Sequence, residues 1–332
     1  MSGLVVRRAA LDIGSGATKL VIADVLVESS QSRVQLVRYQ SERPVAFSTD
    51  LLRAETGCLS EEVMLKGLHT LADLLDVCRR LKVTQFAGVA TEVFRQAKNG
   101  GVFLARVKDL GLSVQTISQE QEAMLGYLSG LGMRDWGEDS VVVWDSGGGS
   151  FQISSRVSAG EPLSFYMGSI GALSSHKFLV EEVCGGRLTS TKTVNPVGAE
   201  DCDRLLALLE KKLDQAPGWL LRRDVIAIGG SNSIFQLALR VLHHMRNSES
   251  ESLLTEATAT EALVYCLRKT DAELDFARDF ENADPVTLLV PKLCLLVAVM
   301  RKAAMRSVLP VHCVGSCIGI LTSEQYWPTG SR

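Results

Sequence analysis

The sequence predicts an α/β protein of two similar domains, each with a mixed sheet flanked by helices. The prediction rests first on a pattern that occurs twice, an apolar strand that ends at an Asp, a glycine-rich turn and a second strand. The pattern stands in ALDIGSGATKLVIADV near the N-terminus and in VVVWDSGGGSFQIS at residues 141–154. A third glycine turn follows an apolar strand in DVIAIGGSNSIF. A chain of 332 residues is also long enough for two domains with a core each.

In the first half of the chain, the two strands of the N-terminal hairpin occupy residues 8–27, and the other elements follow from local patterns. The clearest is a helix over residues 59–81, because Ser60 is a good N-cap and acidic residues fill the first turn. The others are a strand over 33–40, a strand from 83 that passes into a helix after Thr91, a helix over 102–110, a strand over 113–117 and a helix capped by Ser118.

In the second half of the chain, apolar residues at helical spacing predict most of the secondary structure. The expected elements are helices over 196–213, 258–269 and 286–305, a strand over 225–228 followed by a helix to Met245, and a last strand over 311–314. The stretch from Val286 is the most apolar, but it contains Pro291 and Lys292. It therefore predicts a buried helix, and no segment has the length and apolarity of a membrane span.

The three glycine turns are candidate phosphate sites. Glycine permits positive φ and removes Cβ, so backbone N–H groups can crowd around an anion, and an adjacent Asp can hold hydrated Mg²⁺. A tight hairpin without a ligand is the alternative for each turn. The candidate residues are Asp12, Gly14, Ser15 and Gly16 in the first turn, Asp145, Gly147, Gly148, Gly149 and Ser150 in the second, and Gly229, Gly230 and Ser231 in the third.

Two charged residues on predicted helices have chemistry that suits a phosphate. Arg95 follows a strand end and a helix start, and its planar guanidinium can contact a phosphate through two N–H groups. Glu122 lies in the first turn of the helix capped by Ser118, where a carboxylate can act as a general base toward water. The alternatives are a surface arginine and a carboxylate that only stabilises the helix N-terminus.

Composition excludes some partners and favours a location. A net charge of −3 provides no general attraction for nucleic acid or an anionic membrane. The eight cysteines are scattered without zinc-ligand spacing, and the first residues pass directly into a strand without a cleavable signal pattern. We therefore expect buried thiols in a reducing cytoplasm.

The order of these motifs resembles a known family. The two Asp-glycine hairpins and the third turn are similar to the phosphate loops of the actin, Hsp70 and sugar-kinase superfamily, whose two ribonuclease H-like domains face each other across a cleft. Within it, ATEVFRQAKNG, ISQEQEAMLGYLSG and VVVWDSGGGSFQIS resemble the exopolyphosphatase / guanosine pentaphosphatase (Ppx/GppA) family. The opening ALDIGSGATKLVIADV and the later AIGGSNSIF fit in the same order, so the resemblance extends from about residue 8 to about residue 320.

The resemblance implies a function and roles for particular residues. Family members hydrolyse the terminal phosphoanhydride of polyphosphate or guanosine pentaphosphate with Mg²⁺, and they often form dimers. Glu122 matches the catalytic glutamate, Asp145 the aspartate associated with metal and water, and Arg95 a phosphate-contacting arginine. The expected metal ligands are Asp145, Asp12 and Glu122. The implied domains are residues 1–123 and 124–322, and the last helix can pack back on the first domain. The sequence lacks the helical extension that many family members have for long polyphosphate. This favours short polyphosphate chains as the substrate.

Three departures from the family pattern open an alternative. Gln152 stands where the family has a carboxylate, VGSCIGIL (314–321) lacks the family's Arg-Glu pair, and the first turn continues with Gly16 and Ala17 rather than Asn-Ser. A neutral amide can hold water but cannot act as a base. The alternative to a hydrolase is therefore a binding module of the same fold, a sensor or scaffold with little turnover. An actin-like kinase or ATPase is a third possibility.

Overall fold

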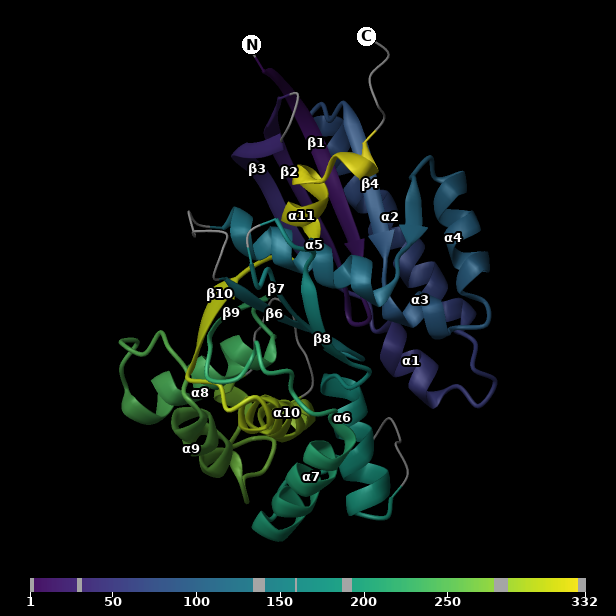
Figure 1. Ribbon diagram of the computed structural model, residues 1–332. Coiled ribbons are helices and arrows are strands. Elements are labelled where there is room, and N and C mark those ends of the chain that lie inside the picture. Colours follow the sequence, from purple (N-terminus) through teal and green to yellow (C-terminus); the bar gives the residue numbers. More distant parts are fainter. Residues whose placement is uncertain are drawn as a thin grey trace. The chain divides into compact units, whose positions relative to one another are not determined.

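The computed structural model describes residues 3–28, 32–133, 141–158, 160–186, 193–277 and 286–327 (Figure 1). The chain forms two compact units, one of Met1–Gly137 with Cys313–Arg332 and the other of Glu138–His312. The division expected at residues 123/124 falls inside α5 (Gln119–Gly132). This helix runs without a break past that point, because Leu125 is buried in the core of the first unit.

The first unit contains a five-stranded mixed sheet in the order β3-β2-β1-β4-β5. Its strands are β1 (Leu4–Ile13), β2 (Ala17–Val27), β3 (Ser32–Pro44), β4 (Gln85–Ala90) and β5 (Val114–Thr116). Strands β1 to β3 form an antiparallel meander, whereas β4 pairs parallel with β1 and β5 pairs parallel with β4.

Helices cover both faces of this sheet because apolar residues of β1 point to alternate faces. Ala9, Leu11 and Ile13 pack in a core with α1 (Phe47–Arg53), α2 (Glu61–Arg80) and α4 (Gly100–Asp109). Ala10 packs in a second core with α5 and α11 (Cys317–Thr322), which lies beside β1 and β2 in Figure 1. By the same alternation, the side chain of Asp12 belongs to the face that carries α5 and α11.

The second unit repeats this sheet. Its order is β10-β9-β6-β7-β8, and its strands are β6 (Val142–Ser146), β7 (Phe151–Ser155), β8 (Ser164–Gly168), β9 (Asp224–Gly229) and β10 (Ser307–His312). Strands β6 to β8 form an antiparallel meander, and β9 and β10 continue the sheet in parallel pairs from β6. The strand expected over 311–314 instead begins at Ser307 and ends at His312, because it pairs with β9 over all six residues.

Registers show that the two sheets are equivalent residue by residue near the glycine turns. Asp12 lies opposite Lys19 on β2, and Asp145 lies opposite Gln152 on β7. On the parallel neighbours, Asp12 pairs with Val89 and Asp145 with Ile228. The predicted fold class, two mixed sheets flanked by helices, is confirmed.

Helices of the second unit enclose one large apolar core. They are α6 (Ala172–Phe178), α7 (Ala199–Lys212), α8 (Ile234–Arg246), α9 (Glu256–Cys266) and α10 (Leu289–Lys302). Trp144 of β6 packs edge-on against Phe235 of α8 with 4.8 Å between the ring centroids. Helix α10 is buried from Leu289 to Met300, Lys292 included, as predicted for this apolar stretch. Across the part of the chain that the structure describes, no helix has both the length and the apolarity to cross a membrane.

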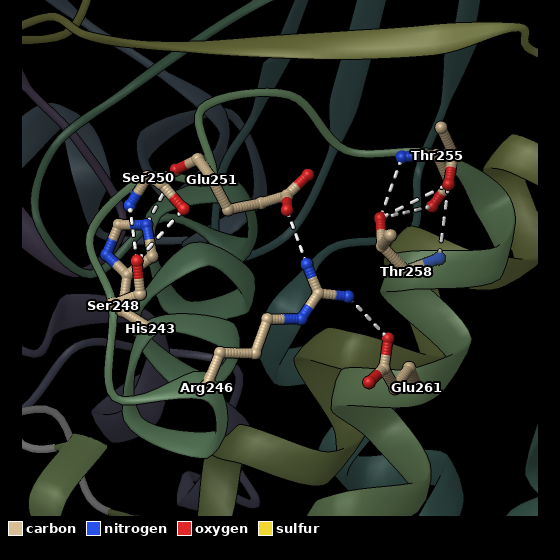
Figure 2. A network of polar contacts seen from close by, with 8 residues as sticks. All are labelled: His243, Arg246, Ser248, Ser250, Glu251, Thr255, Thr258 and Glu261. Atoms are coloured by element: carbon tan, nitrogen blue, oxygen red, sulfur yellow. Dashed lines mark hydrogen bonds and ion pairs between the residues drawn. The ribbon is translucent and has the colours of Figure 1, made fainter.

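The loop between α8 and α9 is held by polar contacts (Figure 2). The Arg246 guanidinium binds the carboxylates of Glu251 and Glu261, the second at 2.7 Å. His243 Nε2 lies 2.6 Å from the Glu251 carbonyl, and His244 stacks on Phe276 with 3.8 Å between ring centroids. Both histidines therefore have structural roles at the end of α8.

Candidate functional site

Backbone contacts orient the first glycine turn. The carbonyl of Ser15 accepts a hydrogen bond from the amide of Ser48 in α1 at 2.9 Å, and the carbonyl of Gly16 accepts one from the amide of Val45 at 3.0 Å. Because a trans peptide points its N–H opposite to its C=O, the Gly16 amide points away from α1. The turn thus presents an N–H group on the side opposite the helix.

Asp12 lies buried beneath the C-terminal segment of its own unit. Only 4% of its surface is exposed, and its Oδ2 accepts a hydrogen bond from the Ser316 amide at 2.9 Å. Gly315, at φ +55°, passes directly over it, and a Cβ there would lie 2.3 Å from Asp12 Oδ2. The other oxygen, Oδ1, is buried and has no hydrogen-bond partner among the described residues. Such an oxygen can accept a hydrogen bond from water or bind a cation.

The structure brings Arg95 and Glu122 together. Arg95 belongs to α3 (Glu92–Gln96), and its Nη2 lies 3.0 Å from Glu122 Oε2 in α5. Its Nη1 donates to the Ile117 carbonyl at 2.7 Å, just after β5. Ser118 fixes the start of α5 through a capping box with Gln121. The Glu122 carboxylate is therefore held in place by an arginine and by a capped helix, and only 13% of its side chain is exposed.

Glu92, which sequence reasoning did not single out, lies against the first glycine turn. It is the first residue of α3, directly after Thr91, and its Oε2 accepts a hydrogen bond from Ser15 Oγ at 3.2 Å. Burial raises the pKa of the Glu92 carboxyl, and the opposing effects of Ser15 and the Arg95 charge are smaller. The sequence shows that Glu92 lies three residues before Arg95 in a predicted helix, but it does not show the contact with Ser15.

The second glycine turn is oriented in the same way as the first. The carbonyls of Gly147 and Gly148 accept hydrogen bonds from Ala172 and Leu173, the first amides of α6, at 3.1 and 2.8 Å. The amides of Gly148 and Gly149 therefore point away from α6, side by side, as in an anion-binding nest.

One glycine beyond the turn makes this arrangement possible. A Cβ on Gly171, the N-cap of α6, would lie 2.4 Å from the Gly148 carbonyl carbon and 2.5 Å from the Gly149 nitrogen. No side chain fits at that position, so the approach of α6 to the turn requires glycine there.

Both turns are also closed by equivalent hydrogen bonds. The Gly14 amide donates to the Ala17 carbonyl at 3.0 Å, and the Gly147 amide donates to the Ser150 carbonyl at 2.9 Å. In each unit the helix after the third strand of the meander braces the turn. The two candidate phosphate loops are thus the same structural device, used once in each unit.

The polar residues beside the second turn form a buried group. Gln152 is 2% exposed, and its Nε2 donates to Ser150 Oγ at 3.0 Å. Asp145 is partly exposed and lies directly opposite Gln152 in the antiparallel pair, so the two side chains share one face of the sheet. The residue that departs from the family pattern therefore lies beside the candidate metal-binding aspartate.

Two cationic side chains donate hydrogen bonds to backbone carbonyls at the third glycine turn. Arg240 Nη2 donates to the Ser231 carbonyl at 2.9 Å, and Lys292 Nζ donates to the Asn232 carbonyl at 2.6 Å. Gly230 accepts a hydrogen bond from the Ser233 amide at 2.9 Å, which starts α8. A Cβ on Gly229 would lie 2.4 Å from that of Ser233, so this turn also requires glycine.

The residues expected to bind a metal do not form a ready-made cage. Among the described ranges there is no group of three or more His, Cys, Asp or Glu side chains placed to hold one. Mg²⁺ does not need such a cage, because it commonly binds one or two carboxylates together with water and substrate phosphates. Asp12 Oδ1, which has no hydrogen-bond partner in the described part of the chain, is a metal ligand of the required type.

Two repeated sheets, each with an aspartate and a braced glycine turn after its first strand, define a protein of the actin-like ATPase fold. Residues 38–184 match the model of the Ppx/GppA phosphatase family, and the resemblance found in the sequence is confirmed. The matched segment contains Arg95, Glu122, Asp145 and the second glycine turn.

Solved structures similar to this chain carry the same family names. A Ppx/GppA enzyme from Aquifex aeolicus has 20% sequence identity and a TM-score of 0.67, with 96% of this chain and 99% of that chain covered. An exopolyphosphatase from Cytophaga hutchinsonii has 19% identity and a TM-score of 0.68 over 95% and 96% of the two chains. An exopolyphosphatase-like protein has 16% identity and a TM-score of 0.74 over 96% and 97%. At these identities the likeness shows the fold.

The C-terminal departure from the family pattern has a structural explanation. Cys317 and Ile318, which follow the glycine turn at 315, are buried in the apolar core with α5. Gly319 approaches so closely that a Cβ would lie 2.2 Å from the Leu125 carbonyl oxygen. This segment packs α11 against α5, and its buried positions suit apolar side chains rather than an Arg-Glu pair.

Proposed function

We propose that the chain hydrolyses terminal phosphoanhydride bonds of short-chain polyphosphate or guanosine pentaphosphate and releases orthophosphate. The observation that supports this most is the Glu122 carboxylate, held by Arg95 at the start of α5 in a unit that also carries a phosphate-type turn. The match to the Ppx/GppA family model includes both residues. We also propose a cytoplasmic location, because none of the eight cysteines, all within the described residues, forms a disulfide.

In this mechanism the chain supplies orientation and a base. The amides of the first glycine turn and the further N–H groups of Arg95, in the same unit as Glu122, bind the terminal phosphates. Glu122 takes a proton from water, and the water oxygen bonds to the terminal phosphorus as the bond to the bridging oxygen breaks. The shortened chain leaves with that electron pair. Mg²⁺ held by Asp12 or Asp145 with phosphate oxygens would spread the charge that develops on them.

A binding module is the second candidate, and Gln152 is the observation that favours it. A buried amide beside Asp145 cannot neutralise Mg²⁺ as a second carboxylate would. The discriminating experiment measures phosphate release from short-chain polyphosphate and from guanosine pentaphosphate, with and without Mg²⁺. Mg²⁺-dependent release supports the hydrolase and ranks its substrates, whereas binding without release supports the module.

Gln152→Glu is expected to strengthen Mg²⁺ binding. A second carboxylate opposite Asp145 should lower the Mg²⁺ concentration for half-maximal hydrolysis by about 10-fold. Without the metal, two adjacent carboxylates repel, so Mg²⁺ should raise the Tm of this variant more than that of the wild type. Differential scanning fluorimetry across a Mg²⁺ titration measures this directly.

Gln115→Glu is the matched control, because Gln115 is exposed on β5 and the substitution makes the same charge change. Its Mg²⁺ dependence should equal that of the wild type. If Gln152→Glu responds to Mg²⁺ no more strongly than Gln115→Glu, then position 152 does not take part in metal binding.

A further inference from the structure

The Glu92 carboxylate accepts the hydrogen bond that the Ser15 hydroxyl of the first glycine turn could otherwise donate to a ligand. A serine hydroxyl has one proton to donate, and that of Ser15 goes to Glu92 Oε2 at 3.2 Å. The other carboxylate oxygen accepts from Gln96 Nε2 on the same helix. A phosphate group that binds this turn must therefore displace the carboxylate from Ser15 or bind beside it.

The second unit has no carboxylate at the corresponding position. Asp12 pairs with Val89, as Asp145 pairs with Ile228, so the ends of β4 and β9 correspond, Ala90 to Gly229. Counted on from these strand ends, Glu92 takes the place of Ser231, although Glu92 begins α3 and Ser231 lies in a turn before α8. The backbones of the two turns are alike, but the residue counted to this place is Glu92 in the first unit and Ser231 in the second.

A carboxylate beside a phosphate site repels a free phosphate ion but not one whose charge is neutralised. Two like charges at contact distance oppose each other strongly in a partly buried site. A divalent cation bound to the phosphate removes most of that repulsion and is itself attracted to the carboxylate. Arg95, three residues further along α3, offsets part of the charge of Glu92.

We propose that Glu92 is a charge filter, a specificity-determining residue that excludes free phosphate chains from the first turn and admits chains complexed with a divalent cation. This inference rests on the proposed function, since it takes the turn at 14–16 to bind phosphate. It narrows the substrate class to the Mg²⁺ complex of a short phosphate chain.

The test measures binding of inorganic tripolyphosphate by calorimetry, in a Glu122→Gln background to prevent turnover. With a chelator present, Glu92→Gln should bind at least about tenfold more tightly than the parent chain, because one repulsive charge is lost. With saturating Mg²⁺ the two affinities should agree within about threefold. Glu92→Ser, which copies the second unit, should behave like Glu92→Gln and guards against a folding defect in either variant.

Glu62→Gln is the matched control, because Glu62 is exposed in the first turn of α2 and loses the same charge. It should bind like the parent chain under both conditions. Equal affinities of the parent and Glu92→Gln in chelator overturn the charge filter and leave the proposed function standing, and so does an equal gain with and without Mg²⁺. If neither the parent protein nor any variant binds tripolyphosphate, with chelator or with Mg²⁺, the proposed function fails and the charge filter fails with it.

Discussion

Replacing Glu122 by Gln is expected to lower phosphate release by about 10²–10⁴-fold, the loss typical of a missing general base. An amide cannot take a proton from water, but its oxygen can still accept the hydrogen bond from Arg95. Binding of the phosphate chain should therefore persist. Steady-state release of orthophosphate and calorimetric binding of the same substrate measure the two effects separately.

Glu120→Gln is the control for that substitution. Glu120 is exposed in the same first turn of α5, so its replacement makes the same change in charge near the helix N-terminus. Its hydrolysis should match the wild type. Turnover by Glu122→Gln at the wild-type rate, or an equal loss in both variants, would falsify the assignment of Glu122 as the base.

Gly171→Ala is expected to deform the second glycine turn. The new methyl group would meet backbone atoms of Gly148 and Gly149 at 2.4–2.5 Å, and backbone cannot move aside as a flexible side chain can. Overpacking of this kind costs about 1–3 kcal/mol of stability. The displaced amides are those of a candidate phosphate loop. The affinity for a phosphate chain should therefore fall about tenfold or more, a loss of about 1.4 kcal/mol of binding free energy. Thermal unfolding and calorimetry check the two expectations.

Gly198→Ala separates the clash from the general effect of alanine at a helix start. Gly198 is the N-cap of α7 in extended backbone, as Gly171 is of α6, but a Cβ at Gly198 has nothing within 4 Å. The loss of N-cap preference is common to both variants. If Gly171→Ala and Gly198→Ala lower stability and binding equally, α6 does not shape the turn.

The strands that carry the candidate site were predictable because they are local. Each apolar run that ends in Asp and glycine formed a strand and a hairpin turn, at Asp12 and at Asp145. Ser118 capped the helix of Glu122 as the sequence indicated, because a cap and its first turn lie within four residues of each other.

The environment of these residues was not predictable in the same way. The contact of Glu92 with Ser15 spans 77 residues, and that of Ser316 with Asp12 spans 304. Neither leaves a local pattern, since the contacts depend on which strands become neighbours in the sheet. The role of Gly171 is similar, because only the packing of α6 shows what a Cβ would meet.

The sequence by itself determined the fold class, the two aspartate-glycine turns and the family that the motifs around Glu122 and Arg95 resemble. All of these depend on short local segments of the chain. Only the tertiary structure decided that Arg95 holds Glu122, that Glu92 contacts the first glycine turn, and that one oxygen of Asp12 has no hydrogen-bond partner among the described residues. The physical reason is that charge, burial and hydrogen bonding at a site are set by residues brought together from distant parts of the chain.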